Sequence, residues 1–146
     1  MSRWLALLGL LPVLAWGNPV STERVTARLV AERLAAAPGT GATLLLVLDI
    51  RPGWHTYWQN PGDSGEPPRI DWTLPDGVTA GPLGFTRPEL IPVGPLANFG
   101  YSGRALHPVT LDLPAHWPPG EPAALRAEAT GWCARSTASR SPRCWS

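Results

Sequence analysis

Apolar and polar residues alternate along several short segments of this chain. Every second residue of Val25–Glu32 is apolar, which is the period of a β-strand, although its alanines, leucine, arginine and glutamate favour a helix. Thr43–Arg51 is a continuous apolar run of strand length, as in a strand covered on both faces. The pattern predicts a strand at the second segment and leaves the first open between strand and helix.

Later segments show the same short period. Strands are predicted at Arg69–Leu74, at Val78–Phe85 as an edge or bulged strand, at Ala105–Leu113, and from Ala123 to Thr130. Within Ala105–Leu113, the alternation puts His107 on the same side as the apolar Val109 and Leu111.

Proline and glycine mark the connections between these segments. Three prolines in Pro88–Pro95 predict an irregular, extended stretch, and Asn98–Gly103 is predicted to be a turn. About seven short strands joined by such turns indicate an all-β sandwich in one domain. The 18 prolines and 15 glycines also argue against a helical bundle, and the net charge of +1 gives no footprint for nucleic acid.

The most distinctive stretch is Gly53–Pro68. Trp54, Thr56 and Trp58 alternate with His55 and Tyr57 at strand period, so both faces of this segment bear large side chains. Asn60-Pro61-Gly62-Asp63 then combines the residues that favour a turn.

The first 17 residues have the features of an export signal. Met1-Ser2-Arg3 is positively charged, Trp4–Trp16 is apolar but short for a membrane span, and Ala15-Trp16-Gly17 offers small residues for a signal peptidase. We expect cleavage after Gly17 and a periplasmic mature protein with no integral membrane span. A lipid anchor is not expected, because no cysteine lies near the cut.

The signature stretch reads GWHTYWxNPGDSGxPP and continues into Ile70–Pro75; Asn98–Gly103 follows later. Together these motifs resemble the periplasmic N-terminal domain of DsbD-type thiol:disulfide interchange proteins, in the branch related to copper-sensitivity suppressors. The resemblance covers residues 25–130. It implies an immunoglobulin-like sandwich and favours a strand at Val25–Glu32.

Two cysteines lie near the end of the chain, Cys133 and Cys144. In an exported protein such a pair forms a structural disulfide by default, which stabilises the fold by about 2–3 kcal/mol. The resembled family instead has a redox pair in a strand of the form W-L-V-C-x-x-x-C-I-P. Cys133 lies near the first of these positions and is the candidate catalytic residue, whereas Cys144 is too distant to be the second.

The segment 131–146 is rich in arginine and serine and departs from the family pattern. This segment can be back-translated into GC-rich codons. If one base is then inserted after the codon of Thr130, the shifted frame encodes W-L-V-C-P-E-H-C-I-P-E-S-A-V-L-E. We therefore expect residues 131–146 to be an out-of-frame tail and residues 18–130 to be the domain. The sandwich would then be incomplete at its C-terminal strand or strands.

The resemblance implies a function in thiol:disulfide exchange, as in the family's protein-disulfide reductases, in pathways such as cytochrome c biogenesis or copper tolerance. Electrons would pass from a membrane-embedded partner domain to thioredoxin-like periplasmic proteins, with no cofactor. The surround of the active cysteines would include Phe99 and Tyr101 as a lid, with His55 and Tyr57 nearby.

The residues alone also allow two other interpretations of the function. Trp54, Tyr57 and Trp58 could form a stacking platform of a non-catalytic module that binds carbohydrate or protein. The chain could also be a non-functional fragment. His55, His107 and His116 match no metal-ligand spacing, so no metal site is expected.

Overall fold

The computed structural model describes residues 18–33, 36–118, 120–135 and 143–145, and all regular structure in these residues is β-strand. Among them, no helix is long and apolar enough to cross a membrane. The strands are β1 (Val20–Ser21), β2 (Val25–Ala31), β3 (Gly41–Ile50), β4 (Trp54–Gly62), β5 (Arg69–Thr73), β6 (Thr79–Ala80), β7 (Glu89–Val93), β8 (Leu96–Tyr101), β9 (Arg104–Asp112), β10 (Arg126–Arg135) and β11 (Arg143–Trp145).

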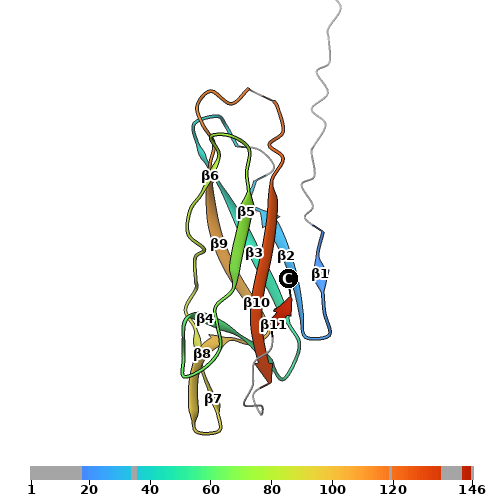
Figure 1. The fold of residues 1–146 in the computed structure, drawn as a ribbon, viewed down its shortest axis with the longest axis vertical. Coiled ribbons are helices and arrows are strands. Elements are labelled where there is room, and N and C mark those ends of the chain that lie inside the picture. Colours follow the sequence, from blue (N-terminus) through green and yellow to red (C-terminus); the bar gives the residue numbers. More distant parts are fainter. Residues whose placement is uncertain (1–17, 34–35, 119, 136–142, 146) are drawn as a thin grey trace, which may run out of the picture.

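The strands form two antiparallel sheets that make up a sandwich (Figure 1). One sheet has the order β1-β2-β3-β9-β6, and the other has the order β11-β10-β4-β8-β7. Strand β5 joins the second sheet by pairing with β10. The predicted all-β, immunoglobulin-like sandwich is thus confirmed, and Val25–Ala31 is a strand.

The core lies between the two sheets and is centred on β3, which pairs with β2 on one side and β9 on the other. Leu46, Leu48 and Ile50 of β3 are buried in the core, and Val47 on the opposite face is buried as well. Coverage of both faces explains why the sequence of this strand is a continuous apolar run. On β9, the predicted alternation is confirmed, with His107 and its apolar neighbours inside.

Two predictions between residues 88 and 103 were wrong. Glu89–Val93 forms β7 despite Pro92, because β7 is the last strand of its sheet and an edge tolerates a residue without an N–H. Leu96–Tyr101 forms β8 rather than a turn, and the chain reverses only at Ser102-Gly103, where Gly103 has φ +68°.

The predicted strand at Val78–Phe85 is shorter than expected. Only Thr79–Ala80 pairs as β6, after which single bonds from the Gly81 and Gly84 N–H groups to β9 carbonyls hold the chain beside that strand. Pro82 lies between these two donors and can make no such bond.

The signature strand β4 continues through Asn60 and Pro61, where a turn was predicted, and pairs with β8 again at Gly62. The loop after it is bonded to β8, since the Asp63 carboxylate accepts the Ala97 N–H and the Asn98 side-chain oxygen accepts the Ser64 N–H. Strand β4 therefore extends further than predicted, although Gly62 has φ +86° and its N–H donates to the Asn60 side-chain oxygen at 3.4 Å.

The segment predicted to lie outside the domain is in part regular in this structure. Strand β10 extends past Thr130 to Arg135, and Arg143–Trp145 pairs with it as β11. The Trp145 indole lies directly against Gly131, which has no side chain to keep it away. Residues 136–142 and 146 fall outside the described residues, and the out-of-frame origin of this tail stays a prediction.

Replacing Gly100 by alanine should lower the free energy of unfolding by about 1–3 kcal/mol. Its Cβ would meet the backbone of Thr56 and Tyr57 on the neighbouring strand, which cannot shift without disturbing β4. Chemical denaturation measures the change, and Ala97→Ser at an exposed position of the same strand serves as the control. A Gly100→Ala protein of unchanged stability would contradict this close packing of β8 on β4.

Candidate functional site

Cys133 of β10 and Cys144 of β11 form a disulfide with a Cα–Cα distance of 5.6 Å. Both residues are buried, with exposed fractions of 0% and 6%. They belong to the core cluster that also includes Tyr101 and Trp145. The disulfide therefore lies inside the sandwich, where it attaches the short β11 to the second sheet.

The register of β10 against β4 decides which way each side chain of this region points. Cys133 is opposite Thr56, and Ala134 is opposite His55. Because successive residues of a strand point to opposite faces, Cys133 faces the core while Ala134 shares the other face with His55 and Tyr57. The predicted site residues His55 and Tyr57 are thus adjacent to each other but lie on the face opposite the disulfide.

The loop after β4 covers this outer face. The Tyr57 ring lies against Gly65, where an added Cβ would collide with the ring, and Pro68 is buried nearby in sequence. His55 contacts the Tyr57 ring edge-on, with 5.2 Å between ring centroids. Tyr57 and His55 are both fully buried, and the loop at Gly65 accounts for part of the cover over Tyr57.

His55 is a polar residue without a visible polar partner at this buried position. Neither of its ring nitrogens has a hydrogen-bond partner in the described part of the chain. Burial lowers the pKa of His55 below its ordinary value of 6.5, which keeps the imidazole neutral. A neutral imidazole with unused nitrogens can accept a proton from, or donate a hydrogen bond to, a group placed opposite it.

Phe99 and Tyr101 do not form a common lid. Tyr101 is buried in the core, and its hydroxyl donates a 2.7 Å hydrogen bond to the Thr86 carbonyl. Burial raises the pKa of Tyr101, and this hydrogen bond opposes the effect. Phe99 is 36% exposed and contacts Trp58 edge-on. Tyr101 is therefore a neighbour of the disulfide within the core, whereas Phe99 lies at the surface.

His107 is a second buried histidine. Its ring lies between Phe85 and Tyr101, with edge-on contacts to both, and Nδ1–H donates to the Gly84 carbonyl at 3.1 Å. Burial lowers its pKa to about 4, against a smaller opposing effect of this hydrogen bond. The sequence predicted this inward position, because His107 alternates in step with the apolar residues of β9.

Two arginines contact the ring of Trp54. The guanidinium carbons of Arg24 and Arg135 lie 4.9 Å and 5.2 Å from its ring centroid. Since Arg24 precedes β2 and Arg135 ends β10, only the fold brings them together, and no sequence pattern could have identified this stack. Tyr57 is fully buried, so Trp54, Tyr57 and Trp58 do not form an open stacking platform.

No group of three or more His, Cys, Asp or Glu side chains within the described ranges is arranged to hold a metal ion. Among the predicted site residues, Cys133 of β10 lies in the core, and His55 of β4 lies on the opposite face of the same sheet.

Comparisons with known proteins agree with this architecture. The family model of the N-terminal domain of the thiol:disulfide interchange protein DsbD matches residues 26–137, a range that includes Cys133 but not Cys144. The crystal structure of the N-terminal periplasmic domain of ScsB from Proteus mirabilis is similar, with a TM-score of 0.60 and 20% identity. The match covers 89% of this chain and 49% of that one, so the chain spans about half of that structure. No curated protein sequence matches the chain.

Replacing both cysteines by serine should lower the free energy of unfolding by about 2–3 kcal/mol, because the disulfide closes a loop with a sequence separation of 11. Denaturant unfolding with and without reductant measures the difference. Reductant should weaken the unsubstituted protein and leave the double variant unchanged. Equal stability of the two proteins under oxidising conditions would contradict a stabilising disulfide.

The stability of the fold should fall between pH 6.5 and about 4 because of His107. The unfolded chain binds a proton at this residue below about pH 6.5, while the folded chain binds it only below about pH 4. Folding is therefore favoured above pH 6.5, and the stabilisation lost on acidification is at most about 3 kcal/mol from this residue. His55, whose pKa is also lowered, adds a dependence of the same sign.

Unfolding free energies measured across this pH range test the assignment. His107→Asn should flatten the pH dependence, since asparagine does not titrate. The same substitution at the exposed His116, His116→Asn, is the matched control. An unchanged slope in the His107 variant would show that His107 does not cause it.

Proposed function

This chain belongs to the family of DsbD N-terminal domains, and we propose that it is the scaffold of a periplasmic thiol:disulfide interchange domain. In this role it would relay electrons from a membrane-embedded partner domain to thioredoxin-like proteins of the periplasm. The proposal rests on one structural observation beyond family membership. Position 134 of β10 lies opposite His55, a buried histidine with two unused nitrogens.

Thiol:disulfide exchange requires a sulfur that another thiolate can reach. The incoming thiolate attacks one sulfur of a disulfide, the S–S bond breaks, and a mixed disulfide forms. A second thiol of the attacking protein then attacks its own protein's sulfur in this mixed disulfide and releases the other protein as a dithiol. The attacking protein is thereby oxidised to a disulfide, and two electrons and two protons have passed to the other protein. Burial of both Cys133 and Cys144 keeps this chemistry from their sulfurs while β11 is in place.

The restored reading frame moves the first cysteine by one position along β10 and so changes the face to which it points. In that reading the first cysteine occupies position 134, one residue after Cys133. A shift of one residue along a strand moves a side chain to the opposite face of the sheet. The cysteine would then lie opposite His55, beside Tyr57 and under the loop that contains Gly65.

His55 suits a cysteine in that place. A neutral imidazole can take the thiol proton, and the resulting thiolate is the nucleophile in exchange. The second cysteine of the restored reading falls at position 138, four residues further along the chain. We therefore propose that residues 131–146 are an out-of-frame tail, that Cys133–Cys144 is a structural disulfide, and that the redox pair belongs to the restored reading.

A protein whose residues 131–146 are replaced by WLVCPEHCIPESAVLE tests the proposal, because it has the same length as the present chain. Its disulfide should be reducible in the folded state and should form a mixed disulfide with a thioredoxin-like protein. The present chain should react only after unfolding. Alkylation of free thiols followed by mass spectrometry measures both reactions, and circular dichroism confirms that each protein is folded.

Two further proteins sharpen this test. In the restored background, His55→Phe should slow alkylation at neutral pH and raise the pKa of the first cysteine. Serine in place of that cysteine should abolish the mixed disulfide. A folded restored protein without any reducible disulfide would refute the redox proposal. A present chain that exchanges rapidly while folded would instead assign the chemistry to Cys133 and Cys144.

A further inference from the structure

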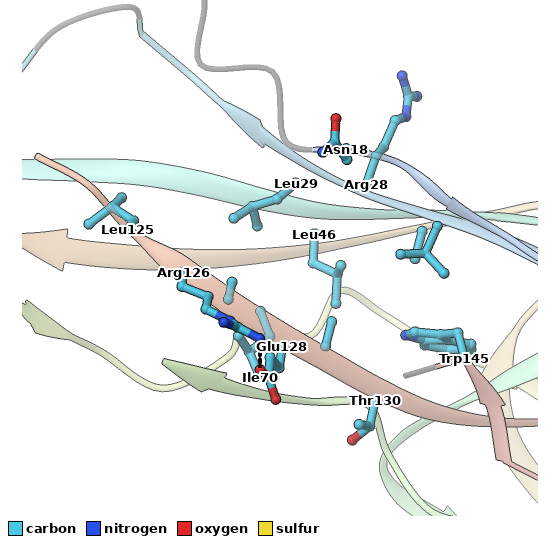
Figure 2. A pocket seen from close by; sticks show the side chains of 14 residues that line it. Asn18, Arg28, Leu29, Leu46, Ile70, Leu125, Arg126, Glu128, Thr130 and Trp145 are labelled. Atoms are coloured by element: carbon cyan, nitrogen blue, oxygen red, sulfur yellow. Dashed lines mark ion pairs between the residues drawn. The ribbon is translucent and has the colours of Figure 1, made fainter. Parts of the chain in front are cut away.

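A groove of about 660 Å³ opens between β10 and β2, along one side of the sandwich (Figure 2). It lies between the two sheets, and most of its walls are apolar. Two of the lining residues, Val20 and Leu125, are among the exposed large hydrophobic residues. The lining includes Leu46, Leu125, Arg126, Ala127, Glu128 and Ala129.

The groove exists because one edge of β10 has no neighbour there. One edge pairs with β5 over Arg126–Thr130 and with β4 over Cys133–Arg135. The other edge pairs with β11 at Gly131 and Trp132 only. Within the described residues, no strand pairs with this second edge over Arg126–Thr130, so its backbone groups are available for another strand.

The free edge is complementary to itself. Arg126 and Glu128 are two residues apart, point to the same face, and form an exposed ion pair of 2.7 Å. If a second β10 runs antiparallel along this edge about a two-fold axis at Ala127, Arg126 lies opposite the partner's Glu128. The same axis places Glu128 opposite the partner's Arg126. A shift of the axis by one residue would place Glu128 opposite the partner's Glu128, which is unfavourable.

Side-chain sizes on the inner face agree with the same axis. Leu125 would lie opposite the partner's Ala129, and Ala127 opposite the partner's Ala127. A large side chain thus packs against a small one at the groove. In this register the leucine of each copy becomes buried in the other copy's groove, which Leu46 and Ala129 line, and the small side chain of Ala129 provides space for it. Charge and size select the same register independently.

We propose that this edge is the interface of a homodimer, in which the β10 strands of two copies pair antiparallel across the groove. Main-chain hydrogen bonds between the strands provide affinity, and the Arg126–Glu128 pairs fix the register. Because the paired segment is short, the dimer is weak and its population depends on protein concentration. The inference is independent of the thiol chemistry and concerns the chain in its present form.

Charge reversal tests the proposal with variants at two exposed positions. Arg126→Glu places glutamates opposite glutamates across the axis, and Glu128→Arg places arginines opposite arginines. Each variant alone should dimerise at least about tenfold more weakly than the unsubstituted protein, since two like-charged pairs form. Mixed together, the two variants should form a heterodimer, because every cross-pair then joins opposite charges.

Sedimentation equilibrium of protein purified from the periplasm measures these constants, and circular dichroism verifies the fold of each variant. Arg69→Glu, a charge reversal at an exposed residue of the adjacent β5, is the matched control and should not affect association. The proposal is overturned if the unsubstituted protein is monomeric at all concentrations. It is also overturned if the reversed variants associate as well as the unsubstituted protein, or fail to pair with each other.

Discussion

The pairing of β10 with β5 and then with β4 is the constraint on which this region depends. Five consecutive pairs from Arg126–Thr73 to Thr130–Arg69 fix the direction of each side chain before the strand reaches β4. The chain between β4 and β5 leaves the sheet and returns, yet both strands pair with the same neighbour. Consequently the face to which each side chain of residues 131–135 points follows from the pairing of residues 126–130, which precede the tail.

This register separates two chemically different environments by the thickness of one sheet. Cys133 lies among apolar residues of the core, while His55, which pairs with the next residue, lies on the other face beside the Tyr57 ring. The sulfur on the inner face is buried and bonded to Cys144. A side chain on the outer face would instead have the His55 imidazole opposite it. One position along the strand therefore decides which of the two environments a side chain enters.

The sequence predicted those strands whose patterns are local and missed those that depend on their neighbours. Alternation identified β9, including the inward position of His107, whereas at β2 it left strand and helix open and the family resemblance favoured the strand. Leu96–Tyr101 has turn-forming residues, and only pairing with β7 and β4 makes it a strand. Cys133 and Tyr101 were predicted as neighbours and share the core. The exposure of Phe99 depends on what packs around it, and the face of His55 required the register.

The attachment of β11 links the final step of folding to the cellular compartment. A strand of 3 residues has too few backbone bonds to remain docked unaided, so the disulfide is what retains Trp145 against Gly131. Reduction of the disulfide would remove this covalent attachment, and the groove beside Trp145 would lose one of its walls. Closure of this side of the sandwich would therefore depend on oxidising conditions.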